Sequence, residues 1–417
     1  MRGFRVWARL LGIEGQGVIE GVELDEEAEA VVVSVRPRAG ARRRCGVCGA
    51  RCAGYDRGSG RRRWRALDVG AVKAYLEADS VRVSCPEHGV VAAGVPWARH
   101  GAGHTRDFDD VVAWLATHTA KDAIRELMRI AWPTVGSIIA RVVADADAAG
   151  GDRLSGVRRI GIDEVSYRKG HKYLVVVVDH DTGTLLWAAP GREKKTLAAF
   201  FDVLGEDRCK ELTLISADGA DWIADVVALR APQAKLCMDP FHVVAWAGKA
   251  LDLVRRDAWN TARRGGHKAL ARSVLRSRWV LWKNPGDLTE KQTARLAEIA
   301  LTNKTLYRAY LLKEQLREVF TVGGAAGIAL LDKWLAWACR CRIGPFVELA
   351  RKMRRYRTDI ANALTHRLTN ARVESVNTRI RLITRMAFGF KSVDALLALA
   401  MLDLGGYCPP LPGRTHT

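Results

Sequence analysis

The order of apolar and polar positions divides the chain into segments of different secondary structure. Over residues 1 to about 40 apolar and polar residues alternate, which predicts strands at 18–24 and 30–35 joined by an acidic turn. A Gly- and Arg-rich stretch that includes residues 61–65 is expected to form a loop, and residues 78–83 another strand.

From Asp107 to about Ala146 the apolar period becomes helical. The break at residues 132–134 separates short helices, as in a helix-turn-helix whose second helix starts at Thr134. Small residues and glycines from 144 to 156 predict a linker.

Beyond residue 157 short strands alternate with helices. Strands are expected at 159–164, 173–179, 184–188, 212–216 and 235–239, and helices at 195–203 and 221–229. Three antiparallel strands, a helix, a fourth strand, a helix and a fifth strand is the order of an RNase H-like fold. An all-helical stretch is expected from 242 to about 366, with further helices at 370–384 and near 393–402.

Composition narrows the function. The length of 417 residues predicts two to four modules. A hydrophobic content of 48% is enough to form a core and excludes global disorder. The formal net charge of +20 is spread through folded-looking sequence, which favours nucleic acid as the partner. No secretory h-region and no run of about 18 apolar residues is present. We therefore expect a cytoplasmic, nucleoid-associated protein without a membrane partner.

Acidic residues stand where this sheet would bring them together. Asp163 ends the first strand and Asp218 follows the fourth, which is its neighbour in the RNase H-like order. Oxygen ligands suit Mg²⁺ or Mn²⁺, and two ions about 3.5–4 Å apart support phosphodiester cleavage. A single acid at a strand end is more often solvated or a helix cap, so the hypothesis depends on the acids acting as a set.

Glu374 is the third candidate of this set. It shares one face of the 370–384 helix with Asn370, Asn377 and Arg381, at positions i, i+4, i+7 and i+11. We expect Asp163, Asp218 and Glu374 to be catalytic and to bind two Mg²⁺ or Mn²⁺ ions, with Asn370 and Asn377 as accessory residues.

Four of the nine cysteines lie in the first 85 residues, and the odd number argues against a disulfide scaffold. Cys45-x-x-Cys48 and Cys85-x-x-His88 supply four ligands suited to one structural, tetrahedral Zn²⁺. Cys52 could replace one of the four, and buried or spare cysteines are the alternative.

Nine arginines fall between residues 42 and 65, with Tyr55 and Trp64 interleaved. Arginine neutralises phosphates and aromatic faces stack, so this segment is a candidate DNA-binding region, whereas the alternative is a solvated basic loop. The candidate DNA-binding residues are Arg42, Arg43, Arg44, Arg61, Arg62, Arg63, Arg65 and Arg381.

Three motifs resemble those of the ISL3 family of bacterial insertion-sequence transposases, and the resemblance covers nearly the whole chain. They are Gly161-Ile162-Asp163-Glu164, the run from Asp239 to Val244, and the run from Asn370 to Asn377 followed by residues 385–390. The resemblance implies an N-terminal zinc finger and a DD-E RNase H-like nuclease with a helical insertion between the second Asp and the Glu. It also implies that terminal inverted repeats are the DNA recognised.

The second catalytic acid has two candidates, Asp218 and Asp239. We favour Asp218 because the fourth strand adjoins the first. Asp239 with His242 resembles a D-x-x-H element of related transposases and is an accessory candidate; its alternative role is a helix N-cap. Glu164 and Asp221 rank lower.

The expected architecture is multidomain and of mixed α+β and α/β class. It comprises a zinc-binding β module (1–104), a helix-turn-helix (105–150), an RNase H-like domain in two parts (155–242 and 366–405), an all-helical insertion (243–365) and a tail (406–417). The expected function is cleavage of double-stranded DNA ends and joining of the 3′-OH to target DNA by a homodimer or higher oligomer. Alternatives are a catalytically silent DNA-binding regulator and an RNase H-like nuclease or resolvase.

Overall fold

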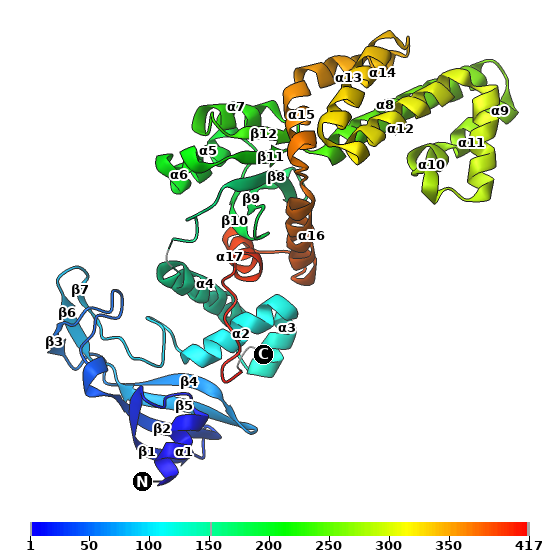
Figure 1. The fold of residues 1–417 in the computed structure, drawn as a ribbon. Coiled ribbons are helices and arrows are strands. Elements are labelled where there is room, and N and C mark those ends of the chain that lie inside the picture. Colours follow the sequence, from blue (N-terminus) through cyan, green and yellow to red (C-terminus); the bar gives the residue numbers. More distant parts are fainter. Residues whose placement is uncertain (1, 151, 415–417) are drawn as a thin grey trace. The chain divides into compact units, whose positions relative to one another are not determined.

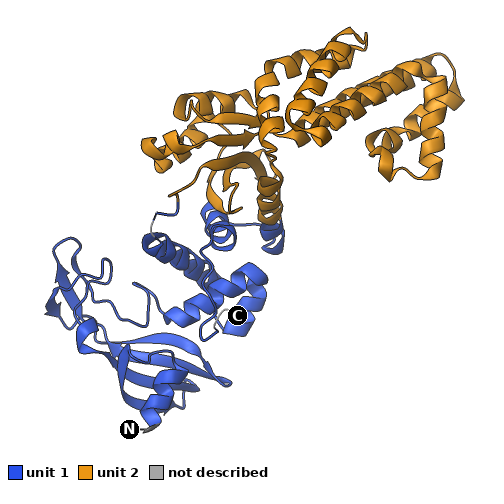
Figure 2. Cartoon of the chain, viewed as in Figure 1, with its two compact units in different colours: residues 1–153, 382–417 blue, residues 154–381 orange. Residues whose placement is uncertain are grey.

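The computed structural model describes residues 2–150 and 152–414, and the chain forms two compact units. The first unit contains residues 1–153 and 382–417, and the second contains residues 154–381 (Figure 2).

A four-stranded sheet begins the first unit. Its order is β1 (Gly17–Asp25), β2 (Ala30–Pro37), β5 (Val72–Asp79) and β4 (Arg61–Val69), preceded by α1 (Arg2–Leu10). Leu76, Trp64 and Trp97 are almost fully buried in its core. The predicted strands at 18–24 and 30–35 are confirmed as β1 and β2.

The predicted loop at residues 61–65 is wrong, since these residues begin strand β4. Arg61 and Arg63 both bind Glu77 on the neighbouring strand β5, with Nε to Oε distances of 2.7 and 2.9 Å. These cross-strand ion pairs offset the repulsion between the arginines of the strand.

A smaller antiparallel sheet follows, in the order β3 (Ala53–Asp56), β6 (Arg82–Cys85) and β7 (Gly89–Ala92). The single strand predicted at 78–83 is wrong, because the chain leaves β5 after Asp79 and begins β6 at Arg82. These residues thus serve two separate sheets.

The helices of the first unit are α2 (Arg106–His118), α3 (Lys121–Met128), α4 (Trp132–Ala149) and α17 (Val393–Leu404). α17 packs on α2 and α4. The predicted linker from residue 144 is wrong at its start, since α4 continues to Ala149. Among the described residues no single helix is long and apolar enough to span a membrane, and only the bent pair α3 and α4 meets that criterion jointly.

A five-stranded mixed sheet forms the base of the second unit, in the order β10-β9-β8-β11-β12 (Figure 1). Its strands are β8 (Arg159–Arg168), β9 (Lys172–Asp179), β10 (Leu185–Pro190), β11 (Leu214–Ala217) and β12 (Lys235–Met238). β8, β9 and β10 pair antiparallel, whereas β11 runs parallel to β8 and β12. All five strands were predicted within a few residues.

The two faces of this sheet are covered by different helices. Ile160, Ile162 and Ile215 pack on one face with α5 (Lys194–Leu204) and α7 (Asp221–Arg230). α6 (Glu206–Glu211), which was not predicted, follows α5. Because side chains alternate along a strand, Ser216 and a Cβ placed at Gly161 would both point to the opposite face. α16 (Ala371–Met386) lies on that face.

Helices fill the chain between β12 and α16, as predicted. They are α8 (Pro240–Arg264), α9 (Lys268–Arg276), α10 (Arg278–Trp282), α11 (Glu290–Thr302), α12 (Lys304–Val322), α13 (Gly324–Arg340), α14 (Gly344–Arg355) and α15 (Arg357–His366). They share a core that includes the fully buried Trp334, Leu316 and Phe346.

Candidate active site and zinc cluster

Three neighbouring parallel strands carry one acid each. The prediction that Asp163 ends its strand is wrong, because β8 continues to Arg168, whereas Asp218 and Asp239 directly follow β11 and β12. Asp163 lies two residues beyond Gly161, which pairs with Ser216, so the same register places Asp163 level with Asp218. Ala217 pairs with Met238, which places Asp218 level with Asp239. Alternation along the strands directs all three toward the α16 face. We call Asp163, Asp218 and Asp239 the acid cluster.

Asp163 is the most strongly perturbed member of the acid cluster. Burial, together with the charges of Asp218 and Asp239, raises the pKa of Asp163 to about 6, against the opposing effects of the Glu164 amide and His242. Its Oδ1 accepts a hydrogen bond from the Glu164 amide at 2.7 Å, and its Oδ2 accepts one from Asn377 Nδ2 at 2.8 Å. These charges therefore lie close enough to influence one another.

Asp239, only 2% exposed, has both carboxylate oxygens engaged. Oδ1 accepts a hydrogen bond from the Asn370 amide at 3.2 Å, and Oδ2 lies 2.9 Å from His242 Nδ1. The hydrogen bond to Asp239 raises the pKa of His242. Asp239 occupies the N-cap position of α8, but its side chain makes no capping hydrogen bond. Its contacts instead tie the starts of α8 and α16 together.

Asp218 is differently placed. Its Oδ1 accepts a hydrogen bond from the Ala220 amide at 3.2 Å, in the turn that leads into α7. Its charge acts on both Asp163 and His242, which places it beside them.

Glu374 lies on α16 between two buried asparagines that contact the acid cluster. Asn377 binds Asp163, the Asn370 amide binds Asp239, and both asparagines are only 1% exposed. Glu374 is one turn from each and half-buried. The structure thus brings the helical turn of Glu374 to the acid cluster.

α16 approaches the sheet closely because Gly161 has no side chain. A Cβ at Gly161 would lie 2.3 Å from Val373 Cγ2 and 2.8 Å from His180 Nε2. Glycine is therefore required for Val373, the neighbour of Glu374, to rest on the β8 backbone.

A series of buried hydrogen bonds next to the acid cluster was not predicted from the sequence. His180 Nε2 lies 2.6 Å from Ser216 Oγ, and Ser216 Oγ donates a hydrogen bond to Asn370 Oδ1. Burial lowers the pKa of His180 to about 4. The sequence showed His180 only as part of a turn, and no motif singled out Ser216.

The two lower-ranked acids have other partners. Glu164 forms an ion pair with Arg192, and burial raises its pKa. Its position in β8 alternates with that of Asp163, so it is directed to the opposite face. Asp221 accepts a hydrogen bond from the Tyr356 hydroxyl.

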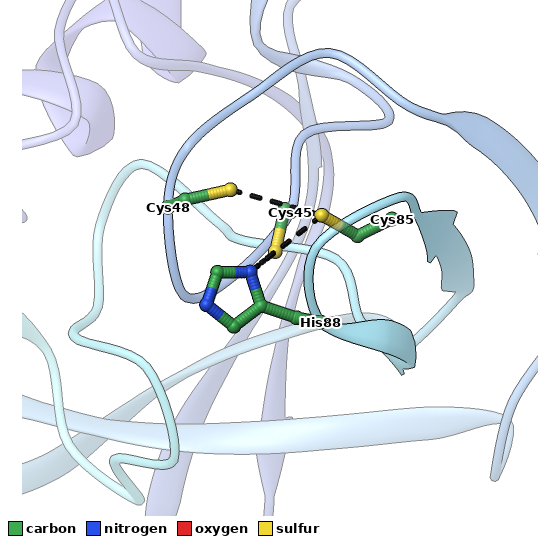
Figure 3. Close-up of side chains that lie close together, drawn as sticks. All are labelled: Cys45, Cys48, Cys85 and His88. Atoms are coloured by element: carbon green, nitrogen blue, oxygen red, sulfur yellow. Dashed lines mark hydrogen bonds between the residues drawn. The ribbon is translucent and has the colours of Figure 1, made fainter.

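Cys45, Cys48, Cys85 and His88 converge in the first unit (Figure 3). One ligand atom from each lies within 4.8 Å of the others; Cys85 Sγ is 3.6 Å from His88 Nδ1 and 3.8 Å from Cys48 Sγ. A hydrogen bond from His88 lowers the pKa of Cys85 to about 6. We call these four residues the zinc cluster. Among the described residues it is the one group of three or more His, Cys, Asp or Glu side chains whose ligand atoms all lie within 4.8 Å of one another, so the ligand atoms of the acid cluster are farther apart.

Cys52 lies beside the zinc cluster but outside it. Its Sγ is directed to the Ala50 carbonyl at 3.4 Å, and burial raises its pKa. The compact set of four candidate ligands contains Cys48 and not Cys52.

The arginines expected to bind DNA differ in exposure. Arg42, Arg43, Arg44, Arg61, Arg63 and Arg381 are exposed, Arg62 is half-buried and Arg65 is buried. Arg61 and Arg63 are held by Glu77, Arg62 donates to the Ala102 carbonyl, and Arg65, 6% exposed, pairs with Asp68. The burial of Arg65 gives it a structural role in the first unit.

Three protein families match the chain. Residues 160–400 match a family described as transposase, residues 95–143 the helix-turn-helix domain of transposase family ISL3, and residues 41–88 the zinc-finger of transposase IS204/IS1001/IS1096/IS1165. The helix-turn-helix match includes α3 and the first part of α4, which confirms that prediction.

Curated relatives match over almost their full length. The transposase for insertion sequence element IS1557 of Mycobacterium tuberculosis is 54% identical over 99% of this chain and 98% of that protein. The transposase for insertion sequence element IS1001 of Bordetella parapertussis is 27% identical over 92% of this chain and 94% of that protein.

Proposed function

The chain belongs to the ISL3 family of insertion-sequence transposases, and from this premise we propose that Asp163, Asp218 and Glu374 carry its DNA cleavage and strand transfer. The family makes it a DDE transposase with a zinc finger and a DNA-binding helix-turn-helix.

The observation that supports these residues is the attachment of α16 to the acid cluster. Asn377 reaches from α16 to Asp163, and Asn370 joins α16 to Asp239. Glu374 lies between these two attachment points, one turn from each, so its turn of α16 is held at the acid cluster.

The site fits divalent cations. Burial and the nearby carboxylates of Asp218 and Asp239 raise the pKa of Asp163, so a bound cation would favour its charged form. Asn377 Oδ1 is also buried without a hydrogen-bond partner among the described residues. Asp163, Asp218 and Glu374 would hold Mg²⁺ or Mn²⁺, which would activate the attacking oxygen and stabilise the leaving one. Asn377 keeps Asp163 oriented through its hydrogen bond.

Asp218 is preferred over Asp239 as the second acid. Both oxygens of Asp239 already hold Asn370 and His242, whereas the Asp218 carboxylate contacts only a turn amide among the hydrogen bonds of the described residues. We assign Asp239 and His242 to positioning the helices around the site.

We further propose that the five-stranded sheet is RNase H-like, interrupted by helices α8–α15 as an insertion. The expected boundaries at 155–242, 243–365 and 366–405 belong to this proposal. Since α17 packs on α2 and α4, the catalytic part ends more naturally within α16. Cys45, Cys48, Cys85 and His88 bind one structural Zn²⁺, and exposed arginines contact the inverted repeats of a dimer or higher oligomer.

The test is cleavage of a DNA fragment carrying an element end, with Mg²⁺, by intact protein, Asp218→Asn and Asp239→Asn. Asp218→Asn should lose at least about a hundredfold in rate, while Asp239→Asn keeps measurable cleavage. Binding to the same DNA, measured by gel shift, should be unchanged in both. Full cleavage by Asp218→Asn would refute the assignment, and binding without any cleavage by the intact protein would favour the silent regulator.

A further inference from the structure

The short helix α10 presents two tryptophans to solvent. Trp279 is 63% exposed and Trp282 is 42% exposed, whereas Trp64, Trp97 and Trp334 are at most 3% exposed. Trp279 is the most exposed of the tryptophans in the described part of the chain. Large aromatic side chains are mostly buried in monomeric proteins, so an exposed adjacent pair indicates a surface that contacts something.

The two indoles and one arginine form a defined surface, which we call the Trp platform (Arg278, Trp279 and Trp282). The rings meet edge to face, with centroids 6.2 Å apart and planes at 76°. The Arg278 guanidinium lies 4.6 Å from the Trp282 ring centroid and 5.5 Å from that of Trp279. Two nearly perpendicular rings leave a corner in which a flat group can stack on one face and touch the other ring.

The platform is fixed to the helices beneath it. Val280 and Leu281, which lie between the two tryptophans, are buried, and Lys313 on α12 donates a hydrogen bond to the Leu281 carbonyl at 2.8 Å. Figure 1 shows α9, α10 and α11 at the end of the paired helices α8 and α12 that is remote from the sheet. The exposed rings are therefore held in place by packed structure, which lowers the entropic cost of binding.

The surroundings of the platform are strongly basic. From Arg256 to Lys283 there are eight Lys or Arg residues and one acid, Asp257. The nearest of them, Arg276 and Lys283, are exposed. A purely apolar protein partner would not call for this charge, whereas a polyanion would.

We propose that the Trp platform binds unpaired bases of DNA by stacking, while the neighbouring basic residues hold the adjoining phosphates. In an intact duplex the base faces are already stacked on one another, so indole rings gain contact only where bases are unpaired, as in a gap or at a frayed or cut end. Arginine beside the rings adds a cation–π contact. This inference extends the DNA-processing role and does not depend on which acids bind metal.

The test compares full-length protein and Trp279→Leu/Trp282→Leu on two DNA molecules of equal length, one fully paired and one with a short internal gap. Binding is followed by fluorescence anisotropy without added divalent metal. The intact protein should prefer the gapped DNA, and the double variant should lose about tenfold in affinity for it while its affinity for the duplex stays within about twofold. A 2-aminopurine in the gap should be quenched by the intact protein only.

Two controls separate stacking from folding. Trp279→Phe/Trp282→Phe retains flat rings and should keep most of the preference. Leu301→Ala, at another exposed apolar position (83% exposed) on α11, should change neither affinity. Equal binding of gapped and paired DNA by the intact protein, or an unchanged preference in the leucine variant, would overturn the proposal. Since cleavage is not measured, a failure here leaves the assignment of the acids untouched.

Discussion

At the scale of single residues, the position of α16 depends on the absence of a Cβ atom at Gly161. Gly161 lies two residues before Asp163, and a Cβ there would overlap Val373 and crowd His180. The glycine thus allows the helix of Glu374 to approach the strand of Asp163.

Replacing Gly161 by alanine should therefore displace α16. We expect Gly161→Ala to lower the free energy of unfolding by about 1–3 kcal/mol and to reduce DNA cleavage more than DNA binding, measured by urea denaturation, a cleavage assay and a gel shift. Adding Val373→Ala should recover part of the loss. Gly248→Ala is the matched control, because nothing lies within 4 Å of its added Cβ, and it should be neutral or stabilising by about 1 kcal/mol. An inert Gly161→Ala would contradict the packing.

His180 should make the second unit sensitive to acid. Burial, with the charges of Arg159 and Arg372, lowers the pKa of His180 from 6.5 to about 4. Its contribution is present above pH 6.5 and is lost as the pH falls toward 4, because the unfolded chain then takes up a proton that the folded chain rejects.

We expect a loss of about 2 kcal/mol between pH 7 and pH 4.5 that His180→Asn removes. Hydrogen exchange of the β8 and β11 amides, with the two proteins compared at each pH, measures it. The same acid sensitivity in both proteins would show that His180 is not its source.

The sequence singled out the three acids, but it did not single out the buried polar residues beside them. Local periodicity placed Asp163 on a strand, Asp218 directly after a strand and Glu374 on a helix, although β8 continues beyond Asp163 to Arg168. His180 and Ser216 are identified only by contacts between segments far apart in the chain, which no local pattern encodes.

At the scale of elements, the zinc cluster joins two segments of the small sheet. Cys45 and Cys48 come from the segment before β3, Cys85 ends β6, and His88 lies in the turn between β6 and β7. The small three-stranded sheet has few buried apolar residues of its own, so metal should supply much of its stability.

Zinc content should separate ligands from neighbours. Cys85→Ser should lose the bound zinc, because the thiolate with the lowered pKa is removed, and protease should then cleave the region of residues 41–92. Cys52→Ser should retain about one zinc per chain, measured by mass spectrometry of metals. If Cys52→Ser loses zinc and Cys48→Ser does not, the ligand set is wrong.

Elements with a plain apolar period were predicted well, and those that depend on charge pairing were not. The strands of the second unit bury continuous valines or isoleucines, as Val175–Val178 of β9 do. β4 was missed because its arginines hide the strand pattern until Glu77 is placed opposite them. α1 was missed because its hydrophobic residues resemble the alternation that follows.

At the scale of the whole molecule, the chain combines DNA-binding modules with a sheet that presents acids. The +20 charge and the zinc-finger and helix-turn-helix segments serve attachment to DNA, whereas cleavage needs anionic ligands in a positively charged protein. Such a division predicts that DNA binding survives the loss of any one acid. On this account Asp163, Asp218 and Glu374 act in cleavage through metal ions.

The most direct measurement is cleavage of element-end DNA by Asp218→Cys with Mg²⁺ and with Mn²⁺. Thiolate is a poor ligand for Mg²⁺ and a better one for Mn²⁺, so the variant should lose at least about a hundredfold with Mg²⁺ and regain about tenfold or more with Mn²⁺, while Asp218→Ala stays inactive with both. Native-level cleavage with Mg²⁺ by either variant, or no recovery of Asp218→Cys with Mn²⁺, would contradict metal binding at Asp218.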